Sequence, residues 1–365
     1  MTINPNLLKN IRRMVPYMAG EQPRDKVVKL NTNENPYPPS PKVSKVLKEM
    51  DVQDLRLYAD PNSRELVKVL ADYHQVEESQ IFVGVGSDEV LGFCFLTYFN
   101  SGKPILFPDI TYSFYKVWAD LYSIPFECPK LDHNFGLVKS DYSGDIGGII
   151  FPNPNAPTGI YEDLDFIEEV LKANADVIVI IDEAYIDYAG RSACELIPNY
   201  DNLIVVQTFS KSRSMAGMRI GYAISNPTLI RYLDDIKNSF NSYTMNLPAQ
   251  LTGVAAVLDN EYFEERIRQI INTREWVKGE LVKLGFSFTE SAGNFVFTTH
   301  KDCSAAKLYD ELRKRNIYVR YWNTPRISEY LRITIGTKEE MEILLHALKE
   351  IIKERFEKED YGQTP

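Results

Sequence analysis

The chain has 365 residues, 44% of them hydrophobic and 25% charged, so it can bury a large core, and we expect one large domain with a smaller one. Its formal net charge of −10 disfavours nucleic acid and anionic membranes as partners, and an anionic substrate would need a local cluster of arginines. Because the N-terminus lacks a signal-peptide pattern and no run is apolar enough for a membrane span, we expect a cytoplasmic protein.

The cysteines and histidines are scattered along the chain. The four cysteines form no CxxC pair, and the four histidines show no HxxxH spacing. Such a pattern predicts neither a disulfide framework nor a metal site.

The order of apolar and polar segments predicts an α/β fold. Segment 31–41 (NTNENPYPPSP) is rich in Asn and Pro and predicts an extended connector. Apolar residues then recur at helical spacing over 62–74, with Asn62 or Ser63 as the cap. Six apolar runs follow, interleaved with helical patterns at 87–99, 112–122 and 161–173, which predicts a mainly parallel sheet flanked by helices. The runs are 81–86, 104–109, 147–154, 175–185, 202–211 and 218–225.

The pattern changes after about residue 259. A charged helical stretch over 260–284 precedes short strand-like runs and further helical patterns at 304–315 and 338–356. This texture predicts a smaller α+β domain, on which the N-terminal segment could pack. We therefore expect a large domain over 42–258 and a small domain formed by 1–41 and 259–365.

Polar clusters follow four of the predicted strands. They occupy 84–89, 153–159, 182–185 and 208–211. Because ligands of open α/β sheets bind at the carboxyl ends of strands, we expect these clusters to share one crevice.

The first cluster, GVGSDEVL, places a glycine-rich turn before a helix. The amides of Ser87, Asp88 and Glu89 would be free donors at the positive end of the helix dipole, which suits a phosphate. The segment is not a GxGxxG fingerprint, and an ordinary tight turn with an acidic first helical turn is the alternative interpretation.

The segment TFSKSRSMAGMRIGY places Lys211 directly after a buried strand. Burial is costly for an ammonium ion, but it suits a lysine that forms an imine with an aldehyde. Hydroxyl groups at Thr208 and Ser210 and the fixed charge of Arg219 would hold a phosphate nearby. Together these groups indicate a phosphate-anchored aldehyde, with a solvated basic loop as the alternative.

In IIDEAYIDY, Asp182 follows five apolar residues, so its carboxylate needs a partner. A protonated pyridine nitrogen is such a partner, and Tyr185 could donate to the phenolic oxygen of the same ring. A strand-terminal aspartate that caps a turn is the alternative.

Taken together, these motifs resemble the fold-type I aminotransferases and, within them, the histidinol-phosphate aminotransferase family. The resemblance spans 31–336 and covers most of the chain. The matching pieces are NENP (33–36), YADPNS (58–63), GSDE (86–89), PNAPTG (154–159), DEAY (182–185), FSKSRSMAGMRIGY (209–222) and LRITIG (331–336).

The resemblance implies a pyridoxal-phosphate enzyme that exchanges an amino group between histidinol phosphate and 2-oxoglutarate. Lys211 would bond covalently to the cofactor, with Asp182 on the pyridine nitrogen and Tyr185 on the ring oxygen. Tyr112 would stack on the ring, and Tyr58 would reach the cofactor of a second subunit in a homodimer. The phosphate would be held by Ser87, Asp88, Thr208, Ser210 and Arg219, and the substrates by Tyr17, Asn33, Arg320 and Arg332.

The sequence departs from the family pattern before Pro-Thr-Gly. The usual asparagine, which binds the ring oxygen, is replaced by Ala156, so either Asn155 takes over or that hydrogen bond is lost. The residues alone also allow Arg320 and Arg332 to be solvated and Tyr17 and Tyr112 to be packing aromatics. An aromatic amino-acid aminotransferase, a threonine-phosphate decarboxylase-like lyase and a catalytically silent binding protein remain alternatives.

Overall fold

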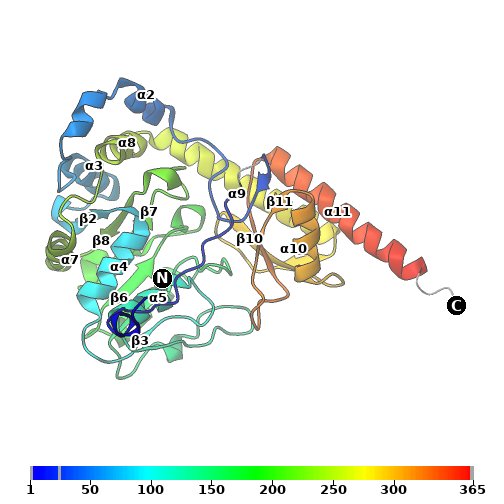
Figure 1. The fold of residues 1–365 in the computed structure, drawn as a ribbon, viewed down its shortest axis with the longest axis horizontal. Helices are drawn as coiled ribbons and strands as arrows, with labels where there is room; N and C mark the ends of the chain where they lie inside the picture. Colours follow the sequence, from blue (N-terminus) through cyan, green and yellow to red (C-terminus); the bar gives the residue numbers. More distant parts are fainter. Residues whose placement is uncertain (1–2, 24–25, 362–365) are drawn as a thin grey trace.

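The structure, a computed structural model, describes residues 3–23 and 26–361. It has a larger and a smaller lobe, and the long helix α9 (Asn260–Lys283) runs from one to the other (Figure 1). The larger lobe is built on a seven-stranded sheet and the smaller on a four-stranded antiparallel sheet. This architecture confirms the predicted α/β fold with a smaller α+β part.

The large sheet is mainly parallel. Its strands lie in the order β2-β8-β7-β6-β5-β3-β4, and only β8 runs antiparallel to its neighbours. Parallel strands covered on both faces need apolar side chains throughout, which is why the sequence shows continuous rather than alternating runs. The strands are β2 (Ile81–Gly84), β3 (Ile105–Leu106), β4 (Phe126–Glu127), β5 (Gly148–Pro152), β6 (Val179–Asp182), β7 (Leu203–Thr208) and β8 (Gly221–Ile224).

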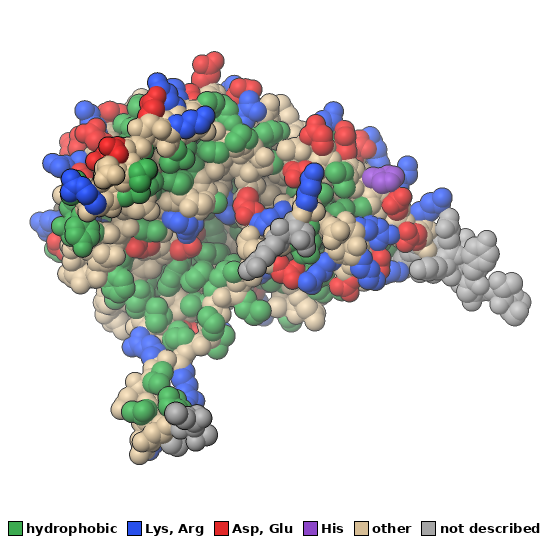
Figure 2. Space-filling model, turned by 45° about the horizontal axis from the view of Figure 1, so that its top comes forward, with side chains coloured by type: hydrophobic (Ala, Val, Ile, Leu, Met, Phe, Trp, Pro, Cys, Tyr) green, Lys and Arg blue, Asp and Glu red, His purple; other side chains and the backbone are tan. Residues whose placement is uncertain are grey.

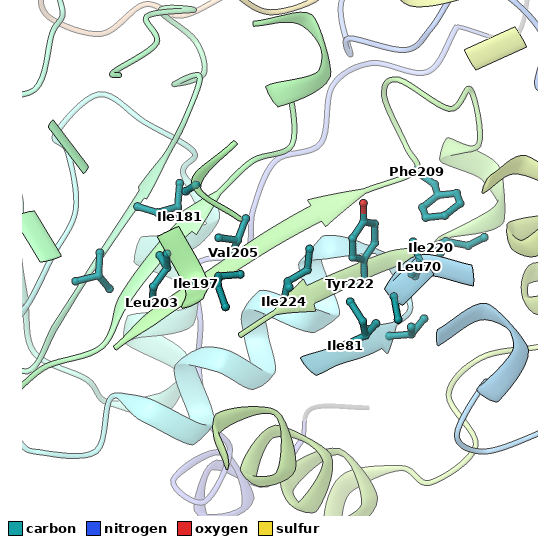
Figure 3. Close-up of a cluster of buried hydrophobic side chains, with 14 of the residues drawn as sticks. Leu70, Ile81, Ile181, Ile197, Leu203, Val205, Phe209, Ile220, Tyr222 and Ile224 are labelled. Carbon is teal, nitrogen blue, oxygen red and sulfur yellow. The ribbon is translucent and has the colours of Figure 1, made fainter. Parts of the chain in front are cut away.

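Two apolar clusters cover the two faces of this sheet. Val205 packs in one cluster with α3, α6 and α8, whereas its neighbours Ile204 and Val206 pack in the other with α4, α5 and α7. Figure 3 shows the first cluster, in which Ile81 of β2 lies beside its sheet partner Ile224 of β8, and Leu70 of α3 lies near Ile220. The helices are α2 (Pro41–Glu49), α3 (Arg64–His74), α4 (Gly86–Tyr98), α5 (Phe114–Tyr122), α6 (Leu164–Ala173), α7 (Pro227–Phe240) and α8 (Leu247–Val257).

The smaller lobe has its own core and also takes up part of the N-terminal segment. Strand β1 (Val28–Lys29) pairs in parallel with β11 (Ile317–Tyr318), and Leu30 is buried in the smaller lobe's core. Residues 28–30 therefore pack on this lobe, whereas Tyr17 stacks on Phe114 of the larger lobe, and the division of the chain into domains stays a prediction. The other elements here are β9 (Phe286–Phe288), β10 (Phe295–His300), β12 (Arg320–Tyr321), β13 (Leu331–Thr334), α10 (Ala305–Lys314) and α11 (Lys338–Tyr361).

The remaining helices are short. Helix α1 (Pro5–Leu8) lies near the N-terminus, and no helix within 3–23 or 26–361 is long and apolar enough to cross a membrane. The 3-10 helices are η1 (Val52–Arg56), η2 (Glu78–Gln80), η3 (Lys139–Asp141), η4 (Ile186–Tyr188), η5 (Ala193–Asn199) and η6 (Ala216–Met218).

The start of α3 differs from the prediction in its chemistry. Ser63 occupies the capping position, but its φ of +47° is left-handed and its side chain makes no capping hydrogen bond. The carboxylate of Asp60 caps the helix instead, because it accepts hydrogen bonds from the backbone amides of Asn62 and Arg64, each at 3.1 Å. The predicted boundary was right, and the predicted capping group was wrong.

Candidate active site

A pocket of about 530 Å³ lies where the carboxyl ends of the large sheet meet the smaller lobe and the N-terminal segment. Loops after β3, β5, β6 and β7 form one wall, and residues 320–327 with Arg332 form the other. Three of the four predicted polar clusters thus contribute to this pocket, and the fourth, 84–89, is joined to it by the hydrogen bond from Tyr112 to Asp88. The predicted site residues that line the pocket are Tyr17, Tyr112, Tyr185, Lys211, Arg320 and Arg332.

Lys211 lies three residues beyond the end of β7. Its Nζ donates a hydrogen bond to the Thr32 carbonyl at 3.1 Å and lies 5.8 Å from the centre of the Tyr185 ring. Among the described residues, no carboxylate forms an ion pair with this amine. The amine therefore stands at the pocket wall without a permanent charged partner, as a nucleophile requires.

Asp182 ends β6 and is almost fully buried behind the pocket. Its carboxylate accepts hydrogen bonds from the Tyr115 hydroxyl at 2.7 Å and from the Ala184 amide at 3.2 Å. Burial raises the pKa of the Asp182 carboxyl to about 6, although the Tyr115 hydrogen bond opposes this shift. No described lysine or arginine forms an ion pair with it, so its charge has no cationic partner among the described residues.

A charged cluster lies at the N-terminus of α4. The Arg219 guanidinium pairs with the Asp88 carboxylate at 3.1 Å and donates to the Ser210 hydroxyl at 3.4 Å. Thr208 donates to the same Ser210 oxygen at 3.0 Å. Helix α4 begins one residue before Ser87, so its first amides and macrodipole favour an anion here.

Glycine is required at the first residue of α4. Gly86 has a φ of +79°, and a β-carbon there would lie 2.5 Å from Nη2 of Arg219. The missing side chain thus lets the guanidinium approach the helix N-terminus. The Asp88 carboxylate also accepts from the Tyr112 hydroxyl at 2.7 Å, which ties the aromatic wall of the pocket to the anion-binding cluster.

Asn155 lies behind the pocket wall with its amide engaged. Its Nδ2 donates to the Ile110 carbonyl at 3.0 Å and to the Thr158 hydroxyl at 2.9 Å, and its Oδ1 accepts from Thr111 at 2.9 Å. Ala156, not Asn155, lines the pocket. Both amide hydrogens of Asn155 are committed to the protein, so in this structure it has no donor left for a ring oxygen.

The two predicted substrate arginines flank an aromatic ring. Arg332 and Arg320 lie 5.2 and 5.3 Å from the Trp322 ring centre, and neither forms an ion pair with a described carboxylate. Arg332 donates to the Asn31 carbonyl at 3.1 Å, but its buried Nε has no partner in the described structure. Burial lowers the pKa of this guanidinium, and the nearby Arg320 charge adds to that effect. Such a pair, without a carboxylate partner among the described residues, has the charge that suits a carboxylate or phosphate.

The two remaining predicted tyrosines lie in different places. Tyr17 lines the pocket and stacks on Phe114, with ring centres 4.5 Å apart. Tyr58 is not part of this pocket: it is 83% exposed and stacks on Tyr243 at 4.4 Å.

Several residues in or next to the pocket carry no signal in the sequence. Thr32 contributes its backbone carbonyl, which accepts the hydrogen bond from Lys211. Tyr115 contacts Asp182 only because α5 packs beside β6. Arg326 reaches across the pocket mouth, where it pairs with Asp109 at 2.9 Å and donates to the Leu131 carbonyl at 2.7 Å. These contacts join distant segments, so no local motif marks them.

Comparison with known proteins places this geometry in a family. The profile of the aminotransferase class I and II family matches residues 25–348. A histidinol-phosphate aminotransferase from Clostridium botulinum (strain Okra / Type B1) is 48% identical over 348 residues, which cover 95% of this chain and 98% of that protein. The chain belongs to the class I and II aminotransferase family, in its histidinol-phosphate aminotransferase branch.

Solved structures of this aminotransferase branch share the fold. The histidinol-phosphate aminotransferase from Clostridium acetobutylicum has a TM-score of 0.83 and 27% identity, covering 89% of this chain and 99% of that one. The enzyme from Sinorhizobium meliloti, solved in complex with pyridoxal-5′-phosphate, has a TM-score of 0.81 and 25% identity, covering 89% of this chain and 91% of that one.

The described residues of this aminotransferase fit such a cofactor. Asp182 is a buried carboxylate without a cation, which suits a protonated pyridine nitrogen. Arg219 lies in a space that a side chain at Gly86 would fill, next to a helix N-terminus that suits a phosphate. Lys211 supplies an unpaired amine on the same wall.

Proposed function

We propose that this aminotransferase uses pyridoxal phosphate to transfer an amino group between L-histidinol phosphate and 2-oxoglutarate, a step of histidine biosynthesis. The observation that carries the proposal is the pair Arg320 and Arg332 on the pocket wall, which have no carboxylate partner within residues 3–23 and 26–361, in a chain of net charge −10. Both proposed substrates are anions, and the two guanidinium groups supply the local positive charge that they need.

When bound, pyridoxal phosphate supplies an aldehyde that accepts the amino group and a ring that takes up electrons. In the proposal, Lys211 holds the cofactor covalently and, once released, its Nζ moves the proton at Cα of the substrate. The Asp182 carboxylate would keep the pyridine nitrogen protonated. Because this carboxylate is buried, the pyridinium would in turn stabilise its negative charge. Tyr185 binds the ring oxygen, and Tyr112 covers the ring.

In this proposal, the cluster at the start of α4 binds the phosphate of the cofactor. Arg219 and the hydroxyls of Thr208 and Ser210 bind it, together with the backbone amides of Ser87 and Asp88. We assign these two amides rather than the Asp88 carboxylate, because that carboxylate already orients Arg219 and Tyr112 and would repel an anion. Arg320, Arg332 and Tyr17 bind the carboxylate of glutamate or the phosphate of histidinol phosphate.

An aromatic amino-acid aminotransferase is the second candidate. Tyr17, Tyr112 and Trp322 all line the pocket, so an aromatic side chain would also find apolar contacts there. The same arginines would then bind an α-carboxylate in both half-reactions.

We further propose that the working enzyme is a homodimer in which Tyr58 completes the neighbouring site. This proposal is supported by exposed apolar side chains around Tyr58, a grouping that lone soluble chains seldom show. The exposed residues are Val52, Leu55, Leu57, Tyr58, Phe240 and Tyr243.

Initial rates with 2-oxoglutarate test the choice of substrate. We expect kcat/KM for L-histidinol phosphate to exceed that for L-phenylalanine by about tenfold, since a phosphate offers the two arginines one more charge-assisted hydrogen bond, worth roughly 1.5 kcal/mol, than a carboxylate does. The reverse ratio would establish the aromatic aminotransferase. Release of carbon dioxide from L-threonine phosphate without glutamate formation would instead establish the lyase.

A further inference from the structure

In the part of the chain that the structure describes, the hydroxyl of Tyr185 has one hydrogen-bond partner, the side chain of Asn33. The Nδ2 of Asn33 lies 2.9 Å from the phenol oxygen, and Asn33 itself is fully buried behind the pocket. Tyr185 lines the pocket beside Lys211. The buried side chain of Asn33 thus contacts Tyr185, a residue that faces the pocket.

The surrounding hydrogen bonds fix which atom of Asn33 faces Tyr185. The backbone amide of Asn33 donates to the Thr334 hydroxyl at 3.0 Å, and that hydroxyl donates to Oδ1 of Asn33, also at 3.0 Å. The side-chain NH₂ is left to face the phenol and must donate to it. The backbone adds a further constraint: Asn33 has a φ of +56°, a conformation that asparagine tolerates better than most residues, and Asn294 donates to its carbonyl at 2.9 Å.

This arrangement decides where the phenol hydrogen points. Because the Tyr185 oxygen accepts from Asn33, its one hydrogen must find a different acceptor, and the described residues offer none. The open direction is the pocket. No second side-chain donor is available from the neighbouring loop, since Ala156 has none and both amide hydrogens of Asn155 are committed to Ile110 and Thr158.

We infer that Asn33 is a positioning residue for Tyr185: its amide holds the phenol oxygen so that the phenol hydrogen is donated to the ring oxygen of the cofactor, which has no help from the 155–156 loop. The inference rests on the proposed function. It also gives Asn33 a role different from the direct substrate contact that the family resemblance implied. Tyr185 acts on the cofactor, and Asn33 acts only through Tyr185.

The test is the pH dependence of the visible absorption of the holoenzyme. A donor to the ring oxygen stabilises the form of the bound cofactor that has lost its proton, so losing the donor moves the absorption midpoint to higher pH. We expect Tyr185→Phe to raise the midpoint by about one pH unit or more. Asn33→Gly, which keeps the positive φ without strain, should shift it the same way by a smaller amount.

The double variant separates a positioning role from a direct one. If Asn33 acts through Tyr185, adding Asn33→Gly to Tyr185→Phe moves the midpoint no further. An unchanged midpoint in Asn33→Gly, or an undiminished shift in the Tyr185→Phe background, would overturn the inference. Thr334→Val, which releases the far side of the Asn33 amide, provides a second variant with the same expected direction.

Asn35 provides the matched control on the same segment. Its side chain donates to the Ser212 carbonyl at 3.0 Å and accepts from the Tyr37 amide at 3.0 Å, with no recorded bond to Tyr185. Asn35→Gly should leave the midpoint in place, and an equal shift there would assign the effect to general loosening of the segment. If the unmodified protein gains no visible band with pyridoxal phosphate, the proposed function itself fails.

Discussion

At the scale of single residues, the main feature of the site is the buried carboxylate of Asp182. Asp182 is buried, and its pKa is raised from 3.8 to about 6 by burial. A raised carboxyl pKa means that the folded protein prefers the protonated form, so the cofactor-free protein loses stability as pH rises from about 4 through about 6. A bound pyridinium would reverse this penalty, because it gives the carboxylate its missing partner.

Asp182→Asn should therefore stabilise the cofactor-free protein relative to the unmodified one as the pH rises. The shift of the Asp182 pKa corresponds to at most about 3 kcal/mol in the free energy of unfolding, reached above pH 6 and absent below pH 4. Urea unfolding of the two cofactor-free proteins at several pH values measures the difference. A difference that stays constant from pH 4 to pH 8 would show that the Asp182 carboxyl does not titrate as described.

Sequence could predict the residues whose chemistry is set by local context. Lys211, Asp182 and Arg219 each sit at a strand end or in a compact motif. In the structure Lys211 lines the pocket, Asp182 ends β6, and Arg219 pairs with Asp88 at the start of α4. The hydrogen bond from Tyr115 to Asp182 could not be predicted, because it depends on how α5 packs against the sheet. The engagement of Asn155 likewise depends on a loop 44 residues away in sequence.

At the scale of elements, the start of α4 combines a tight turn with an anion-binding cluster. Gly86→Ala should weaken pyridoxal-phosphate binding about tenfold or more, because the new β-carbon would lie 2.5 Å from Arg219 at a positive φ. Fluorescence titration of the cofactor-free protein gives the dissociation constant. Unchanged affinity would mean that Arg219 does not bind the phosphate from this position.

A glycine elsewhere gives the control for that substitution. Gly279 lies in α9, and a β-carbon there would meet nothing within 4 Å. Gly279→Ala should leave cofactor affinity unchanged and raise stability by up to about 1 kcal/mol through helix propensity.

The elements themselves were predicted to different extents. The large sheet was predictable because its strands are buried on both faces and read as continuous apolar runs. Strand β1 was not, because its two residues become a strand only through pairing with β11, far along the chain. The antiparallel direction of β8 also leaves no trace in its composition.

At the scale of the whole molecule, much apolar surface remains uncovered in the single chain. Figure 2 shows hydrophobic side chains gathered over the large lobe, from which the N-terminal segment projects. Exposed apolar residues occur along this segment as well as around Tyr58. A second copy of the chain would cover such surfaces, as the proposed homodimer requires. The exposed residues of the segment are Ile3, Leu7, Ile11, Val15 and Met18.

Mixed dimers test whether Tyr58 acts across the interface. Tyr58→Ala and Lys211→Ala should each lower activity strongly, but refolding them together should restore it in part. In a mixed dimer, one site combines the intact Lys211 of the first subunit with the intact Tyr58 of the second. Activity no higher than the sum of the two parent variants would show that Tyr58 does not serve the neighbouring site.

The central claim is that Lys211 carries pyridoxal phosphate and passes an amino group through it, and visible absorption tests this most directly. We expect the protein with pyridoxal phosphate to show a yellow band that L-histidinol phosphate removes and 2-oxoglutarate restores, and we expect Lys211→Ala to lose this cycle. A protein without the band, or a Lys211→Ala variant that turns over substrate normally, would contradict the account.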